Sequence, residues 1–240
     1  MYSFRRLALL LALSLPALSL VHAQNSSSSS SSASPNPDQT QQSQLSVQAR
    51  IRARRAQRRA TAIHDAYAHS WEAYANMGYL RFIPGPTLQR TTYYAWDTGV
   101  TRFFTERLGA TVDGRGYYGT AYVGLNPSSI TRPAVSTYAA MAGPTYRFYL
   151  QPRYGISARV LGGYAHGIFT GDTNGFGTLN GLLYPNSSTY AASASVIGDL
   201  NLTPNVALRL APEYFFTGFG SKTQYSRGFT GGIVYRFGRQ

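Results

Sequence analysis

The chain has 240 residues, with 22 basic and 9 acidic side chains and no cysteine. The lack of cysteine excludes disulfides and thiolate metal sites. Charged residues make up only 13% of the chain, against 19 tyrosines and 24 glycines, whereas a soluble globular domain carries about 25% charged residues. This composition fits a β-sheet whose outer face meets lipid. Much of the formal charge of +13 lies in two short segments, which argues against nucleic-acid binding by the whole chain.

Residues 1–23 are predicted to be a cleavable secretory signal peptide. Arg5 and Arg6 precede a short apolar run from Leu7 to Val21, and Ala23 offers a small residue for cleavage. The alternative, a short membrane anchor, is disfavoured because Pro16 interrupts the run and no basic stop-transfer cluster follows. No cysteine follows the cleavage point, which excludes a bacterial lipoprotein.

Residues 24–46 are rich in serine and glutamine and include seven consecutive serines. Such a segment cannot bury a core, so we predict a flexible, disordered linker. Residues 47–69 lack glycine and proline and predict a basic periplasmic helix around Val47–Ala66. This segment is either a solvated linker or an element that contacts anionic lipid or cell-wall polymer. The arginines available for that contact are Arg50, Arg52, Arg54, Arg55, Arg58 and Arg59.

From Ser70 onward the sequence predicts only strands. Apolar or aromatic residues alternate with polar or small ones at a period of two, which is typical of strands with one lipid-facing side. No segment holds an apolar run long enough for a transmembrane helix. The predicted segments are Ser70–Phe82, Tyr93–Phe104, Leu108–Tyr118, Thr137–Leu150, Gly155–Phe169, Tyr190–Leu202, Val206–Phe216 and a terminal strand that reaches Phe237.

The connections between these strands alternate in length. Short turns follow the second, fourth and sixth strands at residues 105–107, 151–154 and 203–205. Long loops follow the first, third, fifth and seventh strands, at Pro84–Thr92, Gly119–Ser136, Thr170–Thr189 and Thr217–Tyr225. An even number of strands with alternating short turns and long loops is typical of transmembrane β-barrels. This arrangement puts both termini at the short-turn, periplasmic end.

The terminal strand carries an apolar face that ends in two aromatic residues. Phe229, Gly231, Ile233, Tyr235 and Phe237 share this face. The spacing resembles the C-terminal assembly signal of bacterial outer-membrane β-barrels, and implies the barrel assembly machinery as a partner. The residues of this candidate signal are Thr230, Gly232, Tyr235 and Phe237, and three residues follow it.

Residues 70–237 resemble a small eight-stranded outer-membrane β-barrel protein of the OmpA/OmpX type, found in diderm bacteria. The resemblance rests on the strand pattern, the signal peptide and the terminal motif. It implies an all-β fold for residues 70–240, an antiparallel up-and-down transmembrane barrel surrounded by outer-membrane lipid. It says little about function, because such barrels host adhesins, structural anchors and lipid-modifying enzymes.

The inward-facing positions of the predicted strands collect charged residues. Eight strands leave an interior just wide enough for side chains, so these charges must pair with one another or with trapped water. The alternative is a conducting, ion-selective path. The predicted network contains Glu72, Asp97, Asp113, Arg115, Arg147, Arg159, Arg209 and Glu213, with Asp199 and Arg236 on the same face.

No catalytic, metal-binding or cofactor-binding site is predicted. His166 shares a face with the lipid-facing Tyr164, and the sequence places no serine in adjacent register. We therefore expect no nucleophilic catalysis, and a rim histidine is the simpler interpretation. The loop Gly171–Gly177 matches a calcium-binding loop only in part, because a third oxygen ligand and the distal glutamate are missing, so it is predicted to be a turn.

The function favoured by these patterns is that of an integral outer-membrane protein with a filled lumen and a structural or surface-interaction role. The long loops offer tyrosine, asparagine, serine and glycine to an external partner. The alternatives are a small, low-conductance porin, a lipid-modifying barrel enzyme and a secreted small-molecule-binding barrel. The last would need an apolar interior and a polar exterior, which is the reverse of the predicted polarity.

Overall fold

The computed structural model describes residues 37–220 and 222–239. The predicted signal peptide and residues 24–36 of the predicted linker lie outside the described residues. The chain divides into one unit that ends at Ala49 and a second that begins at Arg50. Within the described residues, no helix combines the length and the apolarity needed to cross a membrane.

The helix α1 spans Pro37–Tyr67 and therefore begins earlier than the predicted Val47. Residues 37–46, expected to be linker, belong to it. Proline is tolerated in the first turn of a helix, and the glutamines that follow have good helix propensity. The last turn closes where the amide of Ala68 donates to the carbonyl of His64 at 2.7 Å. The extended backbone of the first strand then follows directly.

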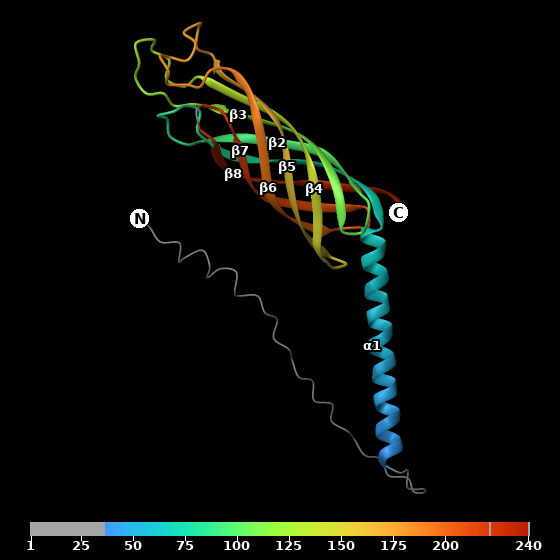
Figure 1. The fold of residues 1–240 in the computed structure, drawn as a ribbon. Coiled ribbons are helices and arrows are strands. Elements are labelled where there is room, and N and C mark those ends of the chain that lie inside the picture. Colours follow the sequence, from blue (N-terminus) through green and yellow to red (C-terminus); the bar gives the residue numbers. More distant parts are fainter. Residues whose placement is uncertain (1–36, 221, 240) are drawn as a thin grey trace. The chain divides into compact units, whose positions relative to one another are not determined.

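Eight strands make up the rest of the fold, each within a few residues of its predicted range (Figure 1). They alternate with long loops at one end and short turns at the other. The end of β8 and the end of α1 both lie at the short-turn end (Figure 1). The strands are β1 (His69–Phe82), β2 (Thr91–Phe103), β3 (Leu108–Thr120), β4 (Ala134–Leu150), β5 (Tyr154–Gly171), β6 (Ser187–Asn201), β7 (Val206–Thr217) and β8 (Gln224–Arg239).

Every strand pairs antiparallel with its sequence neighbours, and β8 pairs with β1 to close the sheet. Closure leaves no sheet edge with unpaired backbone groups, which the hydrocarbon of a membrane could not satisfy. The predicted fold, an eight-stranded antiparallel up-and-down barrel, is confirmed. The β6–β7 ladder keeps one register but lacks two pairs between the Ser195–Glu213 pair and the Gly198–Leu210 pair. Pro212 lies in this gap and has no N–H group to donate to the ladder.

The two faces of the barrel wall have opposite polarity. Outward side chains are apolar or aromatic and strongly exposed, with Met77 at 77%, Tyr94 at 80%, Val112 at 67% and Tyr164 at 71% of full exposure. Inward side chains are buried and include all of the charged residues predicted for the lumen. An apolar exterior around a polar interior is the arrangement of a membrane-spanning barrel. The strands, at 12 to 18 residues, exceed the roughly 9–11 residues that a tilted strand needs to span a bilayer.

Candidate functional site

Among the described residues, ten buried arginine, aspartate and glutamate side chains lie in the interior, with balanced formal charge. Five are arginines and five are carboxylates, and each is at most 6% exposed. Because an isolated buried charge is strongly destabilising, these charges are expected to pair with one another. The arginines are Arg115, Arg147, Arg159, Arg209 and Arg236, and the carboxylates are Glu72, Asp97, Asp113, Asp199 and Glu213.

A first group of charges, the Glu72 network, fills the short-turn end of the interior. Glu72 on β1 accepts hydrogen bonds from Arg147 and Arg236, both at 2.6 Å, and from Arg209 at 3.0 Å. Asp199 accepts from Arg209 at 2.8 and 2.9 Å and from Arg236 at 3.3 Å. Three arginines thus share two carboxylates, and the network carries one excess positive charge. These five residues come from β1, β4, β6, β7 and β8, so the network ties together strands far apart in sequence.

The last residue of α1, Tyr67, is only 1% exposed and packs against the Glu72 network. The guanidinium carbons of Arg147 and Arg236 lie 5.1 and 4.8 Å from the centre of its ring, within the range of cation–π attraction. Its hydroxyl accepts a hydrogen bond from Asn201 at 2.9 Å. Burial raises the pKa of the Tyr67 phenol, which keeps it neutral. The sequence pattern predicted a helix that ends at Ala66, and the role of Tyr67 was not predicted.

A second group, the Arg115 network, lies further along the interior. Arg115 donates to Asp113 at 2.6 Å and to Glu213 at 2.7 Å. Arg159 lies 3.8 Å from both Asp97 and Asp113. Two arginines here face three carboxylates, and the network carries one excess negative charge. The excess charges of the two networks cancel.

Tyr74 on β1 lies between the two networks. Its hydroxyl donates to Asp113 at 2.6 Å. The guanidinium carbons of Arg159 and Arg209 lie 4.9 and 5.2 Å from its ring centre. One buried ring therefore contacts an arginine of each network, and the polar interior is continuous across it.

At the loop end the interior is apolar. Phe169 packs against Phe82 and Phe219, with ring centres 6.1 and 5.0 Å apart, and against Tyr184 at 5.7 Å. Leu179 and Leu183 of the loop after β5 join this cluster, so the loop folds inward. Only a charged interior was predicted from the sequence, and this aromatic cluster was not. The inward-facing aromatic residues at the loop ends of the strands could have indicated this cluster.

The candidate assembly residues all lie on β8. Tyr235 and Phe237 point outward with 54% and 39% exposure, and Phe237 stacks on Trp71 of β1 with ring centres 6.4 Å apart. Thr230 is buried inside the barrel. A side chain at Gly232 would collide with the carbonyl oxygen of Ala75 on β1, which explains why glycine occupies this position.

One prediction about the exterior is wrong. Ser188 pairs directly with His166 across β5 and β6, and its Oγ lies 2.9 Å from His166 Nδ1. A serine–histidine pair can act in nucleophilic catalysis only with a group that orients the imidazole and with donors that bind an oxyanion. In the described part of the chain, no carboxylate makes a hydrogen bond to His166. Both residues also lie within paired strands, so the pair provides a polar contact at the loop-side rim.

The basic stretch Arg50–Arg59 is exposed along α1. Only one of its arginines has a hydrogen-bonded partner within the described residues, since Arg59 donates to the side chain of Gln151 in a short turn, at 3.1 Å from its Nε. His64 lies 2.9 Å from the carboxylate of Glu106 in another short turn. These contacts connect the second half of the helix to the short-turn end of the barrel.

The loop Gly171–Gly177 forms tight turns. Asp172 and Asn174 adopt positive φ angles of 55° and 49°, as these residues often do in turns. No group of three or more histidine, aspartate or glutamate side chains that could hold a metal ion occurs in residues 37–220 and 222–239.

Comparison with known proteins gives likenesses in fold only. No protein-family model matches the chain, and no curated protein matches it in sequence. Among solved structures, Neisserial surface protein A matches 70% of this chain and 97% of its own at 17% identity and a TM-score of 0.48. OprG of Pseudomonas aeruginosa matches 70% and 97% at 9% identity and a TM-score of 0.49. Ail of Yersinia pestis, in complex with the heparin analogue sucrose octasulfate, matches 70% and 99% at 14% identity and 0.44. At these identities and scores, nothing about function is transferred from them.

Proposed function

We propose that this chain is an integral outer-membrane β-barrel protein of a diderm bacterium, with a closed lumen and a structural or surface-interaction role. The apolar, aromatic exterior supports a position in lipid, and the signal peptide predicted for residues 1–23 supports export. The candidate signal at Tyr235 and Phe237 supports delivery by the barrel assembly machinery. Its exposed aromatic rings lie at the short-turn end, where such rings favour the membrane interface.

The balanced pairing of the buried charges carries the closed-lumen proposal. An ion that crosses the barrel must displace guanidinium and carboxylate groups that already satisfy one another, for example the three arginines around Glu72. Side chains also fill both ends of the barrel interior. Tyr67 fills the short-turn end, and the aromatic cluster around Phe169 fills the loop end. A low-conductance porin would need a continuous, mobile path through these contacts.

Conductance of the purified, folded protein in planar lipid bilayers tests this proposal. We expect no steady channels, because the lumen is filled along its length. Heat-modifiable migration of the protein recovered from the same membranes is the control for folding and insertion. Reproducible, steady channels from the wild-type protein would contradict the closed lumen and support the porin alternative.

The long loops and the basic helix are the parts available to partners. At the loop end, exposed groups such as Tyr122 and Leu125 stand clear of the barrel wall, at 62% and 98% exposure, and support contact with an external partner. At the short-turn end, Arg50–Arg59 supports a salt-sensitive attraction to anionic lipid or cell-wall polymer.

A further inference from the structure

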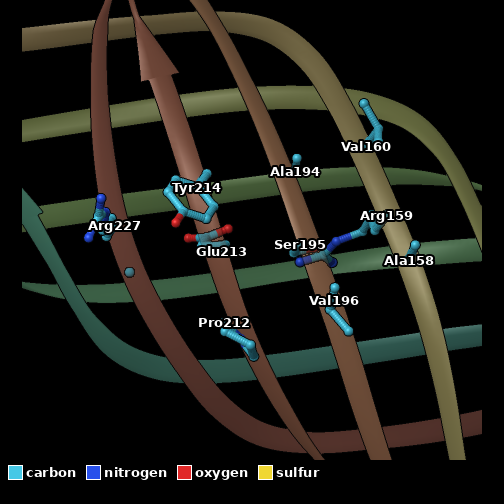
Figure 2. Close-up of a pocket in the computed structure, with 11 residues that line it drawn as sticks. Ala158, Arg159, Val160, Ala194, Ser195, Val196, Pro212, Glu213, Tyr214 and Arg227 are labelled. Carbon is cyan, nitrogen blue, oxygen red and sulfur yellow. The ribbon is translucent and has the colours of Figure 1, made fainter. Parts of the chain in front are cut away.

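A groove crosses the outward face of β5, β6, β7 and β8 (Figure 2). Small residues form its floor, and the larger side chains of Val160 and Tyr214 stand beside them. Its volume is about 530 Å³, within the usual range for small-molecule sites. The small residues are Ala158, Ala194, Pro212 and Gly228.

The groove follows from the local sequence. Two pairs are missing from the β6–β7 ladder here, Val196 with Pro212 and Ile197 with Ala211, and Pro212 has no N–H group to donate. The groove is deep enough at this point to be lined also by Ser195 and Glu213, whose side chains belong to the interior.

The strand register sets the course of the groove. Val160 pairs with Ala194, Ala194 with Tyr214, and Tyr214 with Arg227. Val160 lies well inside β5, whereas Arg227 lies close to the loop end of β8. The groove therefore runs from the middle of the membrane-spanning wall to its loop-side rim.

At the rim the groove ends at Arg227, and a second cationic side chain, Arg81, lies next to it on β1. Arg227 on β8 is directly opposite Arg81 on β1, and both are exposed on the outward face. Like charges in directly opposed positions are destabilising unless something lies between them. In the part of the chain that the structure describes, no ion pair involves either guanidinium. Arg227 instead lies 5.7 Å from the ring centre of Tyr214.

We propose that this groove binds one phosphorylated lipid of the surrounding leaflet. A phosphate of the headgroup lies between Arg81 and Arg227, and an acyl chain follows the small residues down to Ala158. The phosphate supplies the negative charge that the opposed arginines lack, and the chain covers the apolar floor. The inference rests on the proposed position of the barrel in a membrane and adds a specific ligand class to it.

The test is native mass spectrometry of the folded protein released from detergent micelles. The probes are lipid A, the same lipid A after removal of its phosphates, and inorganic phosphate. The variants are Arg81→Gln/Arg227→Gln, which removes the cations, and Ala194→Phe, which fills the groove. Arg153→Gln, an exposed arginine in a short turn at the other end of the barrel, is the matched control.

We expect the wild-type protein and Arg153→Gln to retain one lipid A, and the double arginine variant to bind it on the order of tenfold or more weakly. Ala194→Phe should also lose the lipid, and dephosphorylated lipid A should bind weakly to the wild-type protein. Equal binding of the two lipids, or no effect of Ala194→Phe, would overturn the proposal. So would binding of inorganic phosphate as strong as that of lipid A. Heat-modifiable migration of every variant shows separately whether the barrel itself is folded.

Discussion

Replacing Glu72 by glutamine should be strongly destabilising, because this carboxylate holds three arginines together. Its two oxygens accept hydrogen bonds at 2.6, 2.6 and 3.0 Å, and the side chain is 1% exposed. The substitution keeps the shape but leaves three arginines with Asp199 alone, so the excess charge of the network rises from one to two. Breaking a buried ion pair in this way costs about 3–5 kcal/mol.

The assay is urea unfolding of the folded barrel in lipid vesicles, followed by tryptophan fluorescence. Glu106→Gln, which removes an exposed carboxylate beside His64, is the matched control and should cost less than about 1 kcal/mol. Combining Glu72→Gln with Arg209→Met restores the original excess of one charge. The double variant should therefore lose less stability than the two single variants together. If Glu72→Gln changes the unfolding free energy no more than Glu106→Gln does, the network does not stabilise the barrel as argued.

Four further predictions concern the helix and the closing strand. Tyr67→Ala should lower the unfolding free energy by about 3 kcal/mol, whereas Tyr67→Phe should retain most of the wild-type stability. Equal losses in the two variants would show that the ring does not pack on the arginines. Phe237→Ala should reduce the yield of inserted barrel more than it reduces the stability of barrels already folded. Gly231→Arg should lower the free energy of unfolding in vesicles by roughly 2–4 kcal/mol if residue 231 lies near the membrane midplane. Replacing all six arginines of Arg50–Arg59 by glutamine should abolish low-salt binding of the helix to anionic vesicles; unchanged binding would make the segment a linker only.

The alternation of side chains along each strand was enough to predict the fold and the inward position of the charges. A period of two decides which face a residue such as Arg159 occupies, and the lengths of the connections indicate the two ends of the barrel. The structure has the expected number of strands, all antiparallel and closed between β8 and β1.

Contacts that depend on register could not be predicted in the same way. Alternation assigns His166 to the outward face but does not align β5 with β6, so its pairing with Ser188 was missed. The same limit hides the three-way sharing of Glu72, whose partners come from β4, β7 and β8. Tyr67 was missed for another reason: it lies outside the strands, and nothing in its local sequence indicates that it enters the barrel.

The most direct test of the account is the accessibility of single cysteines on intact cells, which the cysteine-free chain makes straightforward. Leu125→Cys places the thiol in a long loop at a site that is 98% exposed, and Arg153→Cys places it in a short turn at an exposed site. A membrane-impermeant maleimide should label Leu125→Cys on intact cells, and Arg153→Cys only after the outer membrane is permeabilised. Labelling of Arg153→Cys alone on intact cells would show that the barrel has the opposite orientation. Equal labelling of both variants in a detergent-free soluble fraction would contradict a membrane-spanning barrel.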